Sequence, residues 1–443
     1  MDRRRFVTTI AAAAGAVRTA CRTAFAAGAP VRDKPLHGDP WGTAFYDDKE
    51  TAELASVVEN RQPFRFGPRR GSDAPLKVLT FEKEFAQHIN TKYSLAVTSG
   101  TAALEVAYNA LGIGPGDEVI MPAWTWHSDA TAVVRAGALP VFAEIDESFN
   151  IDPDDIEHRI TPNTKVLVAV HVQGTPADMD KVMAIARKHN LKVLEDSAQA
   201  VGARYKGKPT GSIGDIGIFS HQESKTITSG EGGSVVSNDP LLFERAVRFH
   251  DLGGMRAPHQ AIVGTPKLGR GAAFVGTNLR MNEFTGGVML AQVRKLDTIL
   301  AAVRRHAQRV YEGVRDLPGI RFRHQPDPAG EIGTVVFIRF DNKERCDRFV
   351  AAMSAENVPV GKPVGSVVLP VQPYIEHKVT VHPAWPTWTS ERGRQIQYGA
   401  AACPRTLDIL SRFAGPAINP KYTDGDVDDI IKAVRKVYPQ VMA

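Results

Sequence analysis

Short apolar segments alternate with helical segments between about residues 78 and 240, and this alternation constrains the fold more than any other feature of the chain. Helical patterns over 101–111 and 179–188 are two examples of the segments that separate the strands. The predicted strands are 94–98, 118–121, 141–145, 166–170, 192–195, 216–219 and 233–237. Strands that alternate with helices favour an α/β fold whose central sheet is mostly parallel and is enclosed by helices.

The length of 443 residues predicts two or three domains, at roughly 150 residues per domain. We predict a leader over 1–30, an N-terminal arm and large domain over 31–295, and a small α+β domain over 296–443. A helical pattern over about 283–317 is long enough to link the two domains. The small domain is predicted to contain a strand over 334–340 and a helix over 343–357, and its last helix should begin near residue 423 in a capping box.

Composition excludes several classes of protein. Hydrophobic residues make up 43% and charged residues 23% of the chain, which is ordinary for a globular enzyme. No apolar run reaches the roughly 18 residues of a membrane span. The net charge of +5 comes mostly from the arginines of the first 26 residues, and no basic stripe with interleaved aromatics follows, so nucleic acid is not an expected partner. The three cysteines show no zinc-ligand spacing, and no metal site is predicted.

The N-terminus carries the pattern of a targeting segment. Arg3 and Arg4 precede Phe6 and Val7, and 12 uncharged residues separate Arg5 from Arg18. This pattern resembles a twin-arginine export signal, and the small residues of 24–26 offer a cleavage site. We therefore predict export to the periplasm. The alternatives are a disordered leader or a start codon assigned too far upstream, either of which would leave the protein in the cytoplasm.

A candidate phosphate site lies between the first predicted strand and the helix that follows it. Ser99, Gly100 and Thr101 stand at the start of that helix. A helix N-terminus presents free N–H groups and a partial positive charge, and glycine lets the backbone approach an anion closely. The alternative is a simple N-cap, for which serine and threonine are common.

Two further candidates follow later strands. Asp196 comes directly after the predicted strand 192–195, where acids face the ligand crevice of parallel sheets; its alternative role is a helix N-cap. Lys225 lies in a Ser/Gly-rich loop between two apolar strands. A lysine amine forms a Schiff base with a carbonyl when it is neutral, and the alternative is an ordinary surface lysine.

The order of these three parts is more informative than any one of them. A phosphate cradle, then an aspartate at a strand end, then a lysine in a glycine-rich loop is the order of parts in a fold-type I pyridoxal phosphate enzyme. In that arrangement Asp196 holds the pyridine nitrogen protonated, so that the ring acts as an electron sink, and Lys225 forms the Schiff base. Each part requires the other two, so their joint presence favours this interpretation.

A longer series of motifs carries a family resemblance. The matching runs are 81–86, 99–104, 114–122, 195–202, 211–215, 219–225, 230–233 and 278–281. In this order they resemble the DegT/StrS-type sugar aminotransferases, pyridoxal phosphate enzymes that aminate keto-sugars and keto-cyclitols. The resemblance covers roughly residues 40–440 and implies a large domain with a mostly parallel mixed sheet plus a smaller C-terminal domain.

The resemblance also implies roles for residues around the cofactor ring. Lys225 resembles the Schiff-base lysine and Asp196 the partner of the pyridine nitrogen. Gln199 resembles the residue that lies near the phenolic oxygen of the ring. Trp126 matches the aromatic residue that stacks on the ring, where its alternative role would be core packing.

Four more residues correspond to the family's phosphate site. Gly100, Thr101 and Ser220 match residues that bind the phosphate within one chain. Asn278 matches a residue that reaches the phosphate from the neighbouring subunit. The resemblance therefore implies a homodimer with shared active sites.

Departures from the family pattern leave the substrate open. Many members have Phe-Ser-Phe-His before the lysine, whereas this chain has His221 and Gln222 after Ser220, which is similar to the branch acting on inososes. The segment 370–377 lacks a histidine that is often found before Gln-Pro. The expected function is amino transfer from glutamine or glutamate to a keto-sugar or keto-cyclitol. The alternatives are a pyridoxal phosphate sugar dehydratase or lyase that uses the same lysine, and a cofactor-binding sensor without turnover.

Overall fold

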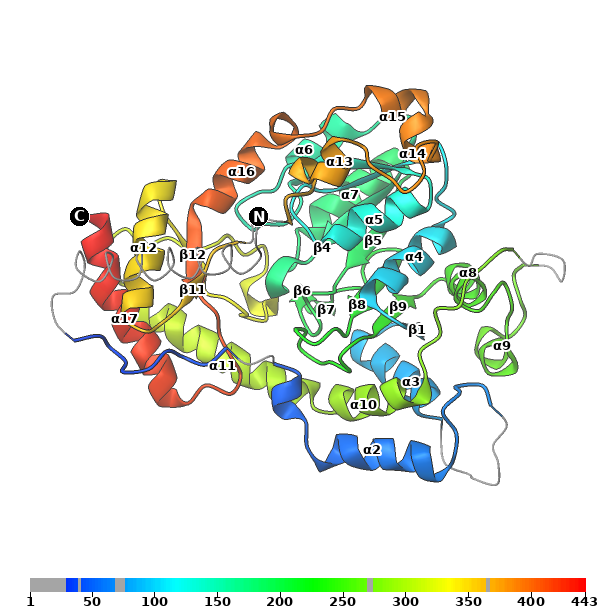
Figure 1. The fold of residues 1–443 in the computed structure, drawn as a ribbon, viewed down its shortest axis with the longest axis horizontal. Helices are drawn as coiled ribbons and strands as arrows, with labels where there is room; N and C mark the ends of the chain where they lie inside the picture. The colour runs from blue at the N-terminus through cyan, green and yellow to red at the C-terminus, as the bar shows by residue number, and fades with distance from the viewer. Residues whose placement is uncertain (1–28, 39–40, 68–75, 269–273, 364–366) are drawn as a thin grey trace, which may run out of the picture.

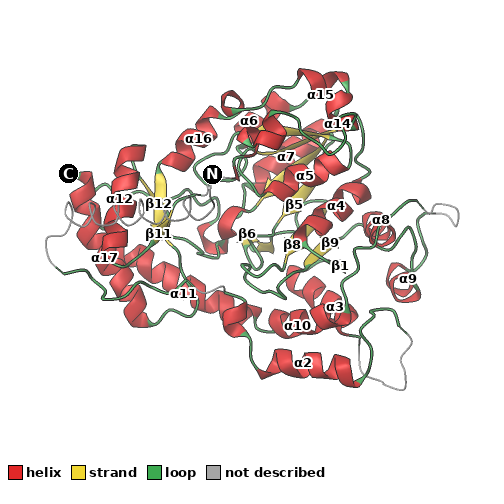
Figure 2. Cartoon of the chain, in the orientation of Figure 1, coloured by secondary structure: helices red, strands yellow, loops and turns green. Residues whose placement is uncertain are grey.

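The computed structural model describes residues 29–38, 41–67, 76–268, 274–363 and 367–443 (Figure 1). The arginine-rich leader lies outside these residues. A large α/β unit contains the main sheet, and a smaller α+β unit near the C-terminus contains α12, β11, β12 and α17 (Figure 2). This is the α/β architecture that the alternating pattern predicts.

The main sheet is mostly parallel. Every pair of neighbouring strands is parallel except the two pairs that β9 makes, with β1 and with β8. Within the described part of the chain its seven strands are, in spatial order, β1 (Tyr93–Val97), β9 (Gly233–Ser237), β8 (Ile216–Ser220), β5 (Lys192–Asp196), β4 (Thr164–Val170), β2 (Glu118–Pro122) and β3 (Leu139–Ala143). These strands lie within about two residues of the predicted ones, because apolar runs of this length are typical of strands buried on both faces.

Helices cover both faces of the sheet. Side chains alternate along β8, so Phe219 meets Phe85 of α3 on one face, with ring centroids 5.0 Å apart, while Ser220 lies beside the start of α4 on the other face. The helices of the large unit are α2 (Asp48–Glu59), α3 (Lys77–Ile89), α4 (Gly100–Leu111), α5 (His127–Arg135), α6 (Pro153–Arg159), α7 (Met179–His189), α8 (Pro240–His250), α9 (Ala257–Val263) and α10 (Glu283–Val293). Shorter elements are the 3-10 turns η1 (Thr43–Phe45) and η2 (Val172–Gly174) and the hairpin of β6 (Arg204–Tyr205) and β7 (Lys208–Pro209).

The smaller unit has an antiparallel three-stranded sheet, whose order is β10 (Ile338–Arg339), β12 (Phe413–Pro416) and β11 (Val360–Gly361). Its helices are α11 (Leu296–Val314), α12 (Lys343–Ala355) and α17 (Asp424–Met442), and α17 packs against both of the others. The predicted capping box is present, because Thr423 Oγ1 accepts from the Asp426 N–H and the Asp426 carboxylate accepts from the Thr423 N–H.

A segment between β11 and β12 packs on the large unit. Its elements are η5 (Leu369–Val371), α13 (Pro373–Glu376), α14 (Pro386–Thr389), α15 (Glu391–Gln395), η6 (Ala400–Ala402) and α16 (Pro404–Ser411). The 3-10 turn η3 (Pro328–Gly330) is not part of this segment and comes before β10. Trp385 Nε1–H donates to the Val134 carbonyl at 2.6 Å, and Arg392 pairs with Glu118 at 2.8 Å. Figure 1 shows α13, α14 and α15 beside α5.

The structure corrects two predicted elements. The stretch 283–317 is not one helix but two, α10 and α11. Arg294 is the C-cap of α10 and Lys295 is the N-cap of α11. The Lys295 ammonium is 8% exposed and donates to Glu50 and to the Phe45 carbonyl, and these contacts compete with a continuous helix. The predicted strand 334–340 shortens to β10, because only Ile338 and Arg339 pair in the ladder with β12.

No described helix is long and apolar enough to cross a bilayer.

Candidate active site

The carboxyl ends of the parallel strands meet at one edge of the sheet, and the sequence-predicted site lies there. A cavity of about 430 Å³ opens at this edge. Seven of the eight predicted site residues line it, namely Gly100, Thr101, Trp126, Asp196, Gln199, Ser220 and Lys225. These residues lie at the carboxyl ends of β5 and β8 or in the segments that follow β1, β2, β5 and β8, so the topology of the sheet brings them together.

Hydroxyl groups and two helix N-termini form one end of the cavity. The Ser99 hydroxyl caps α4 by accepting from the Ala102 N–H at 3.1 Å. The hydroxyl oxygens of Thr101 and of Ser128, in the first turn of α5, are 2.7 Å apart. A Cβ at Gly100 would lie 2.7 Å from the Ser220 Cβ, so only glycine leaves room at this point. Free N–H groups and hydroxyls around an open space suit a phosphate group.

Asp196 lies at the end of β5 and is 4% exposed. Its Oδ1 accepts from the Ala198 N–H at 2.8 Å. Burial raises the pKa of this carboxyl group, while the Ala198 N–H and the Lys225 ammonium act in the opposite direction. A buried carboxylate facing a cavity is suited to a cationic partner, such as a protonated ring nitrogen.

Lys225 lies in a loop that is held by backbone hydrogen bonds. The His221 N–H donates to the Gly232 carbonyl at 2.9 Å, and the Lys225 N–H donates to the Gln222 carbonyl at 2.9 Å. Burial lowers the pKa of the Lys225 amine, and the negative charge of Asp196 partly opposes that shift. A lowered pKa increases the fraction of neutral amine, which is the nucleophilic form.

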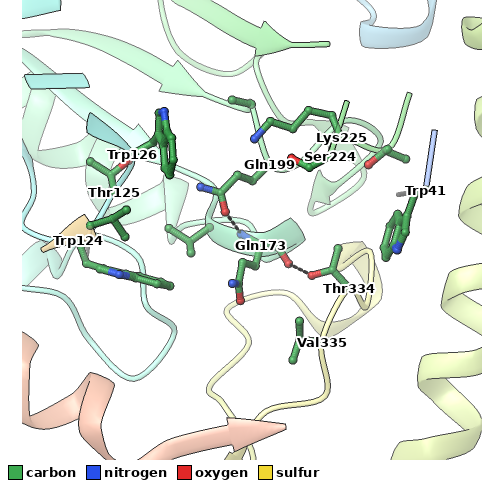
Figure 3. Close-up of a pocket in the computed structure, with 14 residues that line it drawn as sticks. Trp41, Trp124, Thr125, Trp126, Gln173, Gln199, Ser224, Lys225, Thr334 and Val335 are labelled. Carbon is green, nitrogen blue, oxygen red and sulfur yellow. Dashed lines mark hydrogen bonds between the residues drawn. The ribbon is translucent and has the colours of Figure 1, made fainter. Parts of the chain in front are cut away.

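The amide of Gln199 has a fixed orientation. Its Oε1 accepts from the Gln173 N–H at 3.1 Å, and the Gln173 carbonyl in turn accepts from the Thr334 hydroxyl at 2.6 Å (Figure 3). Gln173 adopts a left-handed conformation with φ of 49°, which turns its N–H toward Gln199. Since the Gln199 oxygen is occupied by this bond, its NH₂ group is the part left to donate into the cavity.

Tryptophan side chains line the open side of the site. Trp126 is 58% exposed and lines the cavity together with Lys225 (Figure 3). A continuation of the cavity, about 370 Å³, is lined by Trp41 and Trp124 together with Gln173 and Thr334. The indole faces offer flat apolar surfaces, and Lys225 is the ionisable side chain among the described residues that line this continuation.

Asn278 is the predicted site residue that the structure does not bring to the cavity. It is exposed and forms a β-bridge with Asp251, in a segment that precedes α10. This position is compatible with the expectation that Asn278 acts on a neighbouring subunit, which a single chain does not test.

Several residues at the cavity were not predicted from the sequence. Ser128 and Gln173 contact predicted site residues, and Trp41 and Thr334 line the continuation of the cavity. Ser128 lies two residues after Trp126, so its position after a strand end was an available signal. Gln173 and Thr334 carry no local signal, because they reach the site only through the fold.

The residues of this cavity fit pyridoxal phosphate. The space that a Cβ at Gly100 would fill, the hydroxyls of Thr101 and Ser128 and two helix N-termini suit the phosphate group. Asp196 and Lys225 supply the carboxylate and the amine that such a cofactor requires.

Comparisons with known proteins agree with this geometry. The family model described as the DegT/DnrJ/EryC1/StrS aminotransferase family matches residues 70–435. The chain is 33% identical over 410 residues to the spore coat polysaccharide biosynthesis protein SpsC of Bacillus subtilis (strain 168), which covers 91% of this chain and 98% of that protein. It is 35% identical over 304 residues to the L-glutamine:2-deoxy-scyllo-inosose aminotransferase of Streptomyces kanamyceticus, covering 68% of this chain and 69% of that protein.

Solved structures extend the comparison to the fold. The crystal structure of an aminotransferase from Psychrobacter cryohalolentis aligns with a TM-score of 0.75 at 28% identity, and the alignment covers 91% of this chain and all of that one. The match spans both the large and the small unit, which confirms the fold class predicted from the motifs. The chain belongs to the DegT/DnrJ/EryC1/StrS aminotransferase family and is a pyridoxal phosphate-dependent transaminase.

Proposed function

We propose that this transaminase moves an amino group from glutamine or glutamate to a keto-sugar or keto-cyclitol, with Lys225 and Asp196 as its catalytic residues. The observation that carries the proposal is the single cavity in which Lys225 and Asp196 lie beside a phosphate cradle. Each of these groups has a use in amino transfer, and together they account for the buried polar lining of the cavity.

The cofactor, when bound, supplies an electron sink that stabilises negative charge on the substrate carbon. In our proposal Asp196 holds the pyridine nitrogen, and Gly100, Thr101 and Ser220 hold the phosphate. The Lys225 amine binds the cofactor covalently and carries a proton to and from the substrate carbon. Gln199 donates its NH₂ group toward the ring oxygen, because its own oxygen is held by Gln173.

The lining of the cavity supports a hydroxylated ring as the amino acceptor. Trp41 and Trp124 offer faces for the C–H groups of a ring, while Gln173 and Thr334 offer hydrogen bonds to hydroxyl groups. The similarity to an inosose aminotransferase supports the same class. The choice between a sugar and a cyclitol, and between the two donors, belongs to the proposal.

We also propose a homodimer in which Asn278 of one chain reaches the phosphate site of the other. Its exposure, away from the cavity of its own chain, supports this arrangement. Export through the twin-arginine-like leader stays a prediction, with a cytoplasmic location as its alternative.

The absorbance spectrum of the purified enzyme tests the reaction class. We expect a visible band from the cofactor bound to Lys225, and we expect glutamine or glutamate to convert it to the shorter-wavelength band of the aminated cofactor. If neither donor changes the band while sugar substrates are consumed, the result would favour a dehydratase or lyase. If no substrate changes the band, the result would favour a sensor. The absence of any band after reconstitution with pyridoxal phosphate would refute the site.

A further inference from the structure

A second buried carboxyl group lies beside Asp196, and the proposed reaction does not use it. Asp129 belongs to the first turn of α5 and is 0% exposed. The two carboxyl groups shift each other's pKa, as groups within hydrogen-bonding reach do. Two buried acids in contact require an explanation, because each disfavours the charge of the other.

Each oxygen of Asp129 has a different environment. Oδ2 accepts a hydrogen bond from the Thr125 hydroxyl at 2.6 Å. Oδ1 is buried and has no donor beside it among the described residues, so it has nothing to accept from. A carboxyl group that has an oxygen without a donor and that interacts with a second carboxyl group is the place where a proton would satisfy both groups.

The surroundings decide which of the two acids carries that proton. Asp196 accepts from the Ala198 N–H and feels the charge of Lys225, and both favour its ionised form. Asp129 has neither, and burial together with the charge of Asp196 raises its pKa well above the ordinary value. The proton therefore belongs to Asp129.

The other titratable groups around the pair do not change this assignment. Tyr108 of α4 is buried, and burial with the charges of both acids raises its pKa, so it stays neutral. His171 accepts from the Ala177 N–H through Nδ1 and contacts Glu195 through Nε2. Lys225 and His171 both act on Asp196 in the direction that favours its ionised form.

We propose that Asp129 is a positioning residue that stays a neutral carboxylic acid, donates a hydrogen bond to the Asp196 carboxylate, and so holds that carboxylate toward the cofactor nitrogen. The inference rests on the proposed role of Asp196. A hydrogen bond from Asp129 stabilises the ionised form of Asp196 and restrains its rotation. The Thr125 hydroxyl, in the turn before α5, donates to Asp129, so the series Thr125–Asp129–Asp196 ends at Asp196, which lines the cavity.

Infrared spectroscopy of the cofactor-free enzyme near pH 7.5 tests the protonation directly. We expect the C=O stretch of a protonated carboxylic acid in the wild type, and its loss in Asp129→Asn. The exposed control Asp180→Asn should keep the band. If Asp129→Asn does not fold, Asp196→Asn provides the second variant, and it should alter the band because it changes the hydrogen-bond acceptor.

Cofactor affinity provides the matching readout for the positioning role. Asp129→Ala removes the donor and should weaken pyridoxal phosphate binding about 10-fold, in line with the loss of one hydrogen bond to a charged group. Asp129→Asn keeps an N–H donor and should restore most of that affinity. A wild type without the acid band, or an Asn variant as weak as the Ala variant, would overturn the proposal. Failure of the proposed reaction would instead appear as a spectrum that no donor changes, with the acid band still present.

Discussion

Glu195 and Asp196 are consecutive residues at the end of β5, and their carboxyl groups lie on opposite faces of the sheet. Asp196 faces the cavity. Glu195 faces away and accepts three backbone N–H groups of the loop 211–214, at 2.9, 2.6 and 2.6 Å. It also accepts from His171 Nε2 at 3.0 Å. One acid of the motif therefore serves the chemistry and its neighbour supports the loop that follows.

This division of roles between Glu195 and Asp196 predicts different effects for two conservative substitutions. Glu195→Gln should lower the free energy of unfolding by about 2 to 4 kcal/mol, because its NH₂ group would face N–H donors in a fully buried place. Asp196→Asn should leave that free energy near the wild-type value and lower turnover by roughly 100-fold or more. Urea unfolding of the cofactor-free proteins and steady-state rates measure the two effects, and an equal loss of stability in both variants would contradict the division.

The sequence predicted the parts of this site that lie on regular elements. Asp196 and Gly100 each follow a predicted apolar strand, and the ends of parallel strands meet at one edge whatever the details of packing, whereas Ser220 was predicted from the family resemblance. Strand β9 begins and ends at the predicted residues, because a short apolar run is a local signal. These features needed no knowledge of tertiary contacts.

Other features depend on contacts between distant segments and were therefore missed. The break between α10 and α11 follows from the burial of Lys295 against Glu50, which is 245 residues earlier. Asp129 looks like an ordinary acid in the first turn of a helix, and only the fold places it against Asp196. Gln173 orients Gln199 through its backbone, so its side-chain identity carried no signal.

Gly100 gives a test of the phosphate cradle. Gly100→Ala places a Cβ 2.7 Å from the Ser220 Cβ and should force the two sides of the cradle apart. We expect the dissociation constant for pyridoxal phosphate to rise at least about 10-fold, which corresponds to about 1.4 kcal/mol, while that for unphosphorylated pyridoxal changes little. Gly114→Ala is the matched control, since a Cβ there meets nothing within 4 Å. Equal losses for both ligands would show that the cradle does not hold the phosphate.

The buried imidazole of His221 makes the free energy of unfolding depend on pH. Burial lowers the pKa of this imidazole from 6.5 to about 3, and its Nε2 lies 2.8 Å from the Ser234 hydroxyl. Below pH 6.5 the unfolded chain binds a proton that the folded chain does not, so stability falls as the pH falls toward 3. His221→Asn should therefore lose about 2 kcal/mol less than the wild type between pH 7.5 and 5. His158→Asn, which removes an exposed imidazole, should follow the wild type, and parallel curves for all three proteins would contradict the prediction.

The last prediction concerns the rate at which Lys225 captures the cofactor. Because burial lowers the pKa of its amine, more of the neutral form exists near pH 8 than for an exposed lysine, and attachment should rise with pH and level off below the ordinary lysine value of 10.5. Asp196→Asn removes the charge that opposes the shift, so the midpoint should move to still lower pH. Stopped-flow absorbance of the cofactor-free enzyme mixed with pyridoxal phosphate between pH 6 and 10 measures this midpoint. Lys225→Ala should show no attachment at any pH, and a midpoint that rises in Asp196→Asn would mean that this carboxylate does not act on the lysine.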